Sequence, residues 1–499
     1  MENLKYIKDT LKEVELLGQI ESKLNFDNQV NVPKNGHDLA SDQIGYIDNK
    51  VYELLHSKVY ETAIVNAYKN ISKYSEYDQI LVKNLYKDYA KNKNVSSELS
   101  SSFLKATNKA FSSWLTCKEN ADYESFYPYF EEVVKLTKQT INTREEQKET
   151  LYDTILDDYE KGSSIKKLDD FFALIKKELL PLIEKIKNSS LKIKSDFLHT
   201  PISIERQKKF SEYLLSLENH SSDYLVFLTS EHPFTSGFGK GDERITTHFY
   251  ENDFFSNVYS TLHEGGHALF DQNEPAIYDE YFISGHMTMA MHECMSRFYE
   301  NMIGRSREFT HLIYPTLISQ VPEFKNISEE EIYQAINIAT PSLVRTEADE
   351  LTYPIHILIR YEMEKEFINS EVDFSTLNKK WNKLYKDYLG IDVDNDKVGI
   401  LQDVHWCDTY GYFPSYALGS AYAAQIYHYM NTKFDVSKAI ASGNIKQIND
   451  FLINNVFPYA SIMNPDEWIK KVTEEEFNPN YYISYLKEKF SSLYCLDGE

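Results

Sequence analysis

Cysteine, glycine and proline are scarce in this sequence of 499 residues. It contains 4 cysteines, 17 glycines and 14 prolines, whereas 42% of its residues are hydrophobic and 26% are charged. So few turn-forming and helix-breaking residues argue against a disordered or β-rich chain. The composition therefore favours a globular protein built mainly from helices.

The few cysteines are also far apart. They show no CxxC spacing and no cluster, which speaks against a framework of disulfide bonds. They are Cys117, Cys294, Cys407 and Cys495. We therefore expect free thiols, which are typical of a reducing compartment, and a cytoplasmic location.

Long apolar segments and basic patches are missing as well. No apolar run approaches the roughly 18 residues that a helix needs to span a bilayer, and residues 1–20 lack the apolar core of a signal peptide. The formal net charge is −24, and Lys and Arg are interspersed with acidic residues. Because such a surface repels phosphate groups, we expect neither nucleic acid nor a membrane as a partner.

What the sequence does contain is one helical pattern after another. Apolar residues recur at helical spacing, as at Ile44, Ile47 and Val51, and short polar stretches separate the patterns. Residues 223–249 differ, because β-branched and aromatic residues, glycines and a proline there predict short strands. We predict a mainly α protein with a small β-sheet near residues 223–249. Since no linker is evident, we expect one domain, 1–499, with lobes of about 1–200 and 201–499 around a deep cleft.

Directly after the predicted strands, residues 261–270 read TLHEGGHALF and contain the pattern HExxH. On a helix, His263 and His267 lie one turn apart, so both imidazoles can reach one metal ion. Glu264 lies beside them, as does the carboxylate that takes a proton from the metal-bound water in zinc peptidases. In a chain of this composition, a chance HExxH has a probability on the order of a few per cent.

Two glycines separate the histidine–glutamate pair from the second histidine. Inside a helix, each glycine costs roughly 0.5–1 kcal/mol relative to alanine. Gly265 and Gly266 therefore indicate that a substrate or a neighbouring element closely approaches the backbone at this point.

A catalytic zinc site takes three protein ligands, so a third ligand must lie elsewhere in the chain. A metzincin is excluded, because the glycine and histidine that this class needs after the motif are absent. In residues 284–304, Glu293 and Glu300 share one helical face with Arg297, and both glutamates are candidate ligands. Spacing alone leaves a third interpretation open, namely a solvated face with an ion pair between Glu293 and Arg297.

Three further runs carry groups that could bind or polarise a peptide. They are HPF at 232–234 with DERIT at 242–246, VRTEADE at 344–350, and LQDVHWCDTYGYFPSYALG at 401–419. Arg244 and Arg345 could hold a terminal carboxylate, although their acidic neighbours favour a structural ion pair from chemistry alone. The possible donors to an oxyanion are His405, Tyr410, Tyr412 and Tyr416.

Taken together and in order, these runs resemble the signatures of the carboxypeptidase Taq family of zinc metallocarboxypeptidases. The likeness extends from about Asp38 to the C-terminal helices. The matching motifs are YDTILDDYEKG at 152–162, HPF at 232–234, DxRxT at 242–246, HExxH at 263–267, the HES-type motif at 292–293, the run at 345–350, GxxQDxHW at 399–406 and GYFPxY at 411–416.

The resemblance implies that Glu293, the glutamate of the HES-type motif, is the third ligand beside His263 and His267. It implies one Zn²⁺ per chain, with Co²⁺ or another divalent metal possible, and Glu264 as the base that activates the zinc-bound water. One departure is that Cys294 and a methionine follow the glutamate, where the family commonly has serine and a polar residue.

The resemblance further implies a cleft-bearing helical enzyme, usually a homodimer, that removes single residues from peptide C-termini with broad preference. The second lobe is then the catalytic one. On these motifs, Tyr416 or His405 stabilises the oxyanion, Arg345 or else Arg244 holds the substrate carboxylate, and His232 belongs to the substrate-binding residues.

Two other functions fit the same motif. An oligopeptidase or dipeptidyl carboxypeptidase of related helical fold shares HExxH and a distant glutamate. A non-catalytic helical metal-binding protein is the other alternative. An open set of three ligands speaks against the latter, since structural zinc sites are usually closed by four protein ligands.

Overall fold

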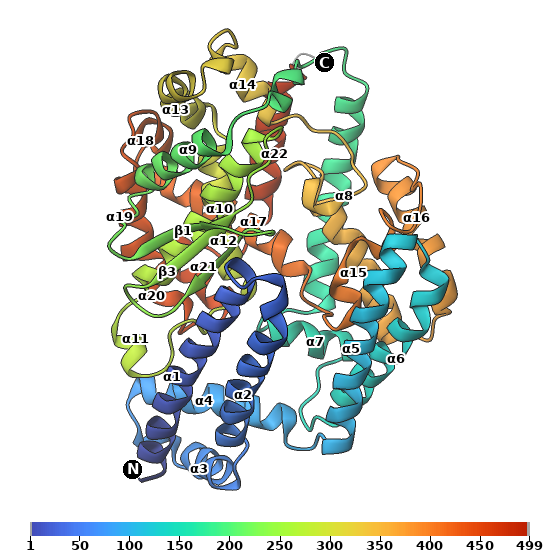
Figure 1. Ribbon diagram of the computed structural model, residues 1–499, viewed down its shortest axis with the longest axis vertical. Helices are drawn as coiled ribbons and strands as arrows, with labels where there is room; N and C mark the ends of the chain where they lie inside the picture. Colours follow the sequence, from blue (N-terminus) through green and yellow to red (C-terminus); the bar gives the residue numbers. More distant parts are fainter. Residues whose placement is uncertain (1, 497–499) are drawn as a thin grey trace.

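The computed structural model describes residues 2–496, and Figure 1 shows a mainly helical molecule with one small sheet, as predicted. Before the sheet lie α1 (Glu2–Val30), α2 (His37–Leu55), α3 (Lys58–Lys69), α4 (Glu76–Asn92), α5 (Ser97–Asn120), α6 (Tyr123–Asn142), α7 (Leu151–Tyr159), α8 (Ile165–Lys187) and α9 (Ile204–Leu217). After it come α10 (Phe254–Asn273), α11 (Ile277–Glu280), α12 (Met289–Arg297), α13 (Arg307–Gln320), α14 (Glu329–Ile336), α15 (Tyr353–Asn369), α16 (Leu377–Leu389), α17 (Pro414–Lys433), α18 (Val436–Ala441), α19 (Ile445–Asn455), α20 (Phe457–Ala460), α21 (Pro465–Thr473) and α22 (Asn480–Leu493).

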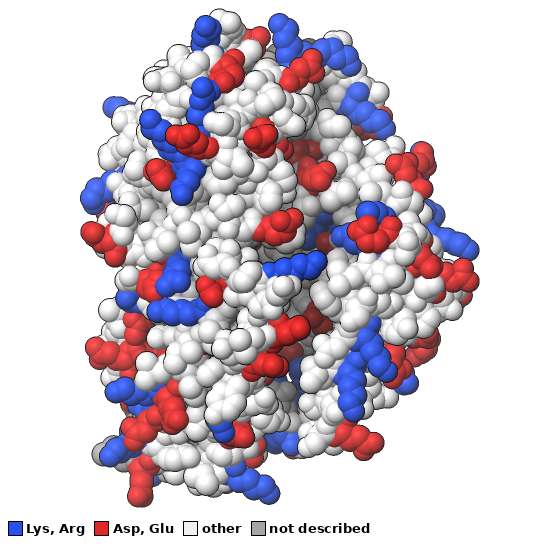
Figure 2. Space-filling model, viewed as in Figure 1, with Lys and Arg blue, Asp and Glu red and all other residues white. Residues whose placement is uncertain are grey.

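One large hydrophobic core unites most of the chain. It draws on buried side chains from Ala110 in α5 to Tyr494, so α5–α8 and the C-terminal helices share it. The division into lobes of about 1–200 and 201–499 stays a prediction. Figure 2 shows a groove running down one face of the molecule, with acidic side chains along it. Within residues 2–496, none of the helices combines the length and the apolar character needed to cross a membrane.

The first four helices have a small core of their own. Ile7, Tyr60 and Val82 are buried in it, and α1 and α2 lie side by side at the front of Figure 1. Near the end of α1, Phe26 lies outside this core. Its ring packs 5.5 Å from that of Phe234 and 5.9 Å from that of Phe238. Through this aromatic contact, the N-terminal helices are attached to the sheet.

The sheet lies within residues 223–249, where the sequence predicts strands. It consists of β1 (Leu225–Thr229), β2 (Phe234–Gly237) and β3 (Glu243–Thr247) in the order β1-β3-β2. β1 is parallel to β3, and β2 is antiparallel to it. Because Phe234 pairs with Thr246, the HPF and DERIT runs are neighbours, and the Thr246 hydroxyl accepts a 3.1 Å hydrogen bond from the Phe234 N–H.

Beneath the sheet lies α10, which carries the HExxH motif. The helix begins where the side chain of Asp253 caps the N–H of Ser256, and it ends just before Pro275. Both glycines of the motif are closely approached, as predicted. A Cβ atom at Gly266 would lie 2.7 Å from the carbonyl oxygen of Met295 in α12, and one at Gly265 would overlap the carboxylate of the buried Glu218.

A methyl group at Gly266 should therefore be poorly tolerated. We expect Gly266→Ala to lower the free energy of unfolding by about 1–3 kcal/mol, because the backbone of α12 cannot yield as a side chain can. Denaturant unfolding measures this. The control is Gly18→Ala in α1, where nothing lies within 4 Å of the added carbon; there the alanine should stabilise by up to about 1 kcal/mol. Equal effects at both positions would contradict the close packing.

Candidate metal centre

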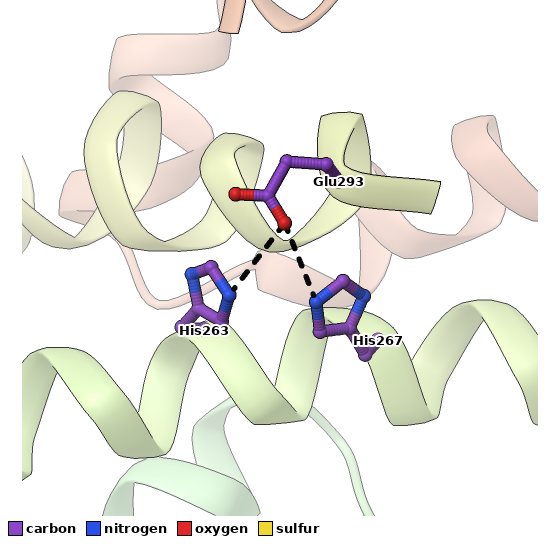
Figure 3. Close-up of side chains that lie close together, drawn as sticks. All are labelled: His263, His267 and Glu293. Atoms are coloured by element: carbon purple, nitrogen blue, oxygen red, sulfur yellow. Dashed lines mark ion pairs between the residues drawn. The ribbon is translucent and has the colours of Figure 1, made fainter. Parts of the chain in front are cut away.

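Three side chains from two helices converge on one point (Figure 3). On α10, His263 and His267 lie one turn apart, with ring centroids separated by 5.0 Å. From α12, Glu293 turns its Oε2 atom toward both rings, 3.9 Å from Nε2 of His263 and 3.8 Å from Nε2 of His267. The three atoms lie within 4.8 Å of one another, and no second cluster of this kind is found within residues 2–496.

The geometry of this group fits a divalent metal. The separations of 3.8 and 3.9 Å are too long for hydrogen bonds. They admit an ion about 2.0–2.2 Å from each atom, the usual distance of zinc from imidazole nitrogen and carboxylate oxygen. Two imidazoles and one carboxylate form the donor set of a catalytic site, which leaves coordination positions for water and substrate.

Glu300, the other candidate, holds a different position. Its Oε2 atom lies 3.0 Å from Nδ1 of His263, on the side of the ring away from Glu293. An N–H at Nδ1 then donates to the carboxylate, which orients the ring and leaves the Nε2 lone pair free for a metal. Glu300 is thus placed to support His263.

Arg297 connects the two glutamates. Its Nε atom donates a 2.7 Å hydrogen bond to Oε1 of Glu293, and its Nη1 donates a 3.1 Å bond to Oε2 of Glu300. The i,i+4 ion pair is therefore present, but the solvated face is wrong, since Glu293 is only 9% exposed. Burial raises the pKa of Glu300, yet Arg297 and Arg305 outweigh it and hold that pKa far below its usual range.

The two histidines differ in their electrostatic surroundings. Burial lowers the pKa of His263, but the carboxylates of Glu293 and Glu300 outweigh it and raise the pKa above 6.5. Burial, reinforced by positive charge at His292, holds the pKa of His267 well below its ordinary value. The His292 ring stacks on that of His267 at 4.5 Å and is itself anchored by Asp271, 2.8 Å from its Nε2. His267 is therefore neutral over the physiological range.

Glu264 lies beside the group and is held by the sheet. The hydroxyl of Thr235 in β2 donates a 2.6 Å hydrogen bond to Oε2 of Glu264. Burial raises the pKa of this carboxyl above its ordinary value, although His263 opposes the shift. A raised pKa suits a group that takes up and releases a proton near neutral pH. Thr235 was not among the predicted residues, and its position directly after HPF is the only sequence signal for it.

Arg345 and Tyr416 lie together, beyond Arg297. The guanidinium of Arg345 lies 5.2 Å from the ring centre of Tyr416, and its Nη1 atom is 3.5 Å from the hydroxyl of Tyr353. The ring of Tyr353 in turn packs under Arg297 at 4.5 Å. A continuous series of contacts thus leads from Glu293 to Arg345.

Arg345 does form a structural ion pair, but with the distant Asp403 and not with its acidic neighbours in the sequence. Its Nη2 donates a 3.0 Å bond to Asp403, a carboxylate that also pairs with Arg360. The side chain is buried, with 8% of the residue exposed. His405 lies nearby, 4.7 Å from the ring of Phe413. Burial lowers the pKa of His405 to about 4, so this histidine is neutral under physiological conditions.

Arg244 and His232 lie on the sheet. Arg244 makes two hydrogen bonds to Asp242, of 3.0 and 3.1 Å, and its guanidinium packs 4.6 Å from the ring of Phe238. His232 is exposed in the loop between β1 and β2. Among residues 2–496, no hydrogen bond or ion pair joins either of them to His263, His267 or Glu293.

Comparisons with known proteins agree with this arrangement. The model of the family described as carboxypeptidase Taq (M32) metallopeptidase matches residues 6–490. Carboxypeptidase 1 of Bacillus subtilis is 35% identical over 491 residues, covering 98% of this chain and 98% of that protein. The structure of a carboxypeptidase from Pyrococcus furiosus is similar with a TM-score of 0.93 and 30% identity, covering 98% and 99%. That of an M32 carboxypeptidase from Deinococcus radiodurans has a TM-score of 0.95 and 26% identity, covering 99% and 100%.

The role of Glu300 can be measured as metal affinity. We expect Glu300→Ala to weaken the binding of Zn²⁺ about 10- to 100-fold, because His263 loses the acceptor that orients its ring. Competition with a chromophoric chelator measures the affinity. Glu488→Ala, an exposed glutamate in α22, is the control and should change nothing. Unaltered affinity in Glu300→Ala would show that the hydrogen bond to His263 is not needed.

Metal binding should also depend on pH in a defined way. Protons compete with the metal for His263, whose pKa is raised above 6.5, but not for His267, whose pKa is well below it. As the pH falls below the raised pKa of His263, we expect the affinity for Zn²⁺ to fall about tenfold per pH unit, because one proton must leave His263 for each metal ion bound. Calorimetric titration in buffers of different ionisation enthalpy counts the protons released. Two protons per metal would contradict the assignment.

Proposed function

Because the chain belongs to the carboxypeptidase Taq (M32) metallopeptidase family and is therefore a metallocarboxypeptidase, we propose that it uses zinc to release single amino acids from the free C-terminus of peptides, with broad specificity. The observation that supports zinc is the convergence of His263, His267 and Glu293, with Glu264 beside them. Co²⁺ or another divalent metal is the alternative occupant of the same donor set.

When bound, a divalent metal supplies Lewis acidity, which lowers the pKa of water and polarises a carbonyl group. Glu264 takes the proton from the attacking water and later delivers it to the leaving amine. Thr235 fixes Oε2 of Glu264, so Oε1 remains to exchange the proton. The raised pKa of this carboxyl makes the carboxylate a stronger base for the first of these transfers.

Tyr416 is the donor that we assign to the developing oxyanion, with His405 as the alternative. Burial raises the pKa of Tyr416, so its phenol keeps its proton and donates a hydrogen bond. Arg345 holds the terminal carboxylate of the substrate, and the contacts that link it to Glu293 support this choice. Arg244 is the alternative, and the exposed His232 contributes to substrate binding from the sheet.

We propose a homodimer in the cytoplasm. Cys117, Cys294 and Cys407 are buried free thiols and Cys495 is an exposed one, in keeping with a reducing compartment. Membership of the family removes the non-catalytic alternative.

Product analysis tests the function. A peptide with a free C-terminus should yield a ladder of products shortened by one residue at a time, whereas its C-terminally amidated twin should resist. Glu264→Gln should keep about one zinc per chain and lose about 10²–10⁴-fold in turnover. Mass spectrometry follows the products and metal analysis the zinc. Internal cuts or dipeptide release would favour the oligopeptidase or dipeptidyl carboxypeptidase alternative, and full activity of Glu264→Gln would refute the assigned base.

The two arginines can be separated by kinetics. Arg345→Met should raise the KM for a free C-terminal peptide by about 10- to 100-fold, since a charged hydrogen bond contributes about 1.5–3 kcal/mol. Arg244→Met should change KM less than about threefold, because Arg244 lies on the sheet and lacks the series of contacts that joins Arg345 to Glu293. Zinc content serves as the folding control for both. The reverse result would transfer the carboxylate-binding role to Arg244.

A further inference from the structure

The helix that carries Glu293 is capped by a residue from a distant part of the chain. Oε1 of Glu160 accepts a 2.6 Å hydrogen bond from the backbone N–H of Ala290, which lies 130 residues further along, in the first turn of α12. The residue at the N-cap position, Thr288, makes no capping hydrogen bond with its own side chain. A remote carboxylate therefore satisfies a free N–H group that the N-cap side chain satisfies in most helices.

The segment 152–162, which contains none of the candidate catalytic residues, is folded so as to hold this carboxylate in place. Asp153 accepts a 2.6 Å hydrogen bond from the first N–H of α8, and Asp157 accepts one of 2.8 Å from Gly162. Gly162 has a φ of +84°, which suits glycine at the end of the turn. Glu160 is the acidic residue of the turn that faces inward, and only 2% of it is exposed.

We propose that Glu160 is a positioning residue of the candidate metal centre. By capping α12, it fixes the position of this helix along the helix axis, and thereby the position of Glu293 relative to His263 and His267. The inference rests on the proposed binding of metal by Glu293. Among residues 2–496, Glu160 makes no hydrogen bond to the side chains of His263, His267 or Glu293.

The contacts of α12 act in two directions, across its axis and along it. Glycine contacts bound α12 on two sides: Gly266 of α10 lies against its backbone, and Gly419 of α17 lies against Glu293, where a Cβ would be 2.9 Å from the Cβ of the glutamate. These two contacts set how close α12 lies to α10 and to α17. The cap acts at the end of the helix, one turn before Glu293. A slip of one residue would shift the helix by about 1.5 Å, enough to disrupt the donor set.

The electrostatics of the contact are consistent with this role. A carboxylate at a helix N-terminus is stabilised by the free N–H groups and by the helix dipole. Burial raises the pKa of Glu160 to about 7, and the hydrogen bond from the N–H of Ala290 is among the contacts that oppose that rise. Whether protonated or not, the side chain retains an oxygen that can accept from Ala290.

Three substitutions of Glu160 separate the contributions of its acceptor oxygen, its charge and its length. Glu160→Gln keeps an acceptor oxygen at the same reach, Glu160→Asp keeps the charge but shortens the reach, and Glu160→Leu removes the acceptor at similar size. We expect Zn²⁺ affinity, measured by chelator competition, to fall about 10- to 100-fold in Glu160→Leu and by an intermediate factor in Glu160→Asp. Glu160→Gln should stay within about threefold of the parent.

Glu364 offers a matched control. It is also fully buried, its pKa is likewise raised to about 7 by burial, and it accepts a 2.6 Å hydrogen bond from a distant backbone N–H, that of Gly411. It makes no hydrogen bond to α12 among the residues that the structure describes, and its other partner, the hydroxyl of Tyr152 at 2.9 Å, lies at the opposite end of the segment 152–162 from Glu160. Glu364→Leu should lower the unfolding free energy of the metal-free protein as Glu160→Leu does, while leaving zinc affinity within about threefold.

Equal losses of affinity in the two leucine variants would overturn the inference, because they would reflect general destabilisation. So would parent-like affinity in Glu160→Leu. If that variant does not fold, parent-like affinity in Glu160→Asp overturns it instead. The parent protein and Glu293→Ala are measured beside them. If the parent does not bind zinc, or Glu293→Ala binds it equally well, the proposed function has failed; if both behave as expected, only the role of Glu160 is at stake.

Discussion

The contact between α10 and α12 is the constraint on which the rest of the structure depends. A helix pair separated by ordinary side chains would hold the glutamate of one too far from the histidines of the other. Here Gly266 of the HExxH motif allows the backbone of α12 to lie directly on α10. At this separation, the side chain of Glu293 is long enough to bring its carboxylate between both imidazoles. The sheet, α17 and the turn after α7 all contact this pair and hold it in place.

Around this contact, charged groups are buried in compensated sets. A buried carboxylate is costly unless it is paired and hydrogen-bonded, and here each one that serves the metal centre has a partner. Arg297 lies between Glu293 and Glu300, Arg305 binds the far oxygen of Glu300, and Thr235 binds Glu264. The same arrangement that lowers the electrostatic cost also fixes the direction of each oxygen.

Much of this could be predicted from local sequence pattern, because helices, strands and HExxH are local features. The strands between residues 223 and 249 and the close approach at Gly265 and Gly266 are examples. Glu293 and Glu300 could not be distinguished in this way, since seven residues make two turns and return to nearly the same face. Their difference arises where α12 continues as a π-helical segment, Phe298–Gly304, which redirects the second glutamate toward the back of His263.

Partners distant along the chain were beyond prediction for another reason. A single sequence carries no record of which residues meet after folding, so nothing in it linked Thr235 to Glu264 or Glu160 to Ala290. The alternatives for Arg345 show a further limit. Its acidic neighbours in the sequence suggested an ion pair, but the partner is Asp403, 58 residues further along the chain.

The distribution of these parts along the chain has a consequence for protein synthesis. The cap of α12 comes from residue 160, the histidines from 263 and 267, and the glycine that seats Glu293 from α17, at residue 419. A ribosome must therefore translate more than four-fifths of the 499 residues before the two helices can reach their final arrangement. The donor set of His263, His267 and Glu293 is therefore completed late in synthesis, although its own residues are translated well before the contacts that hold it.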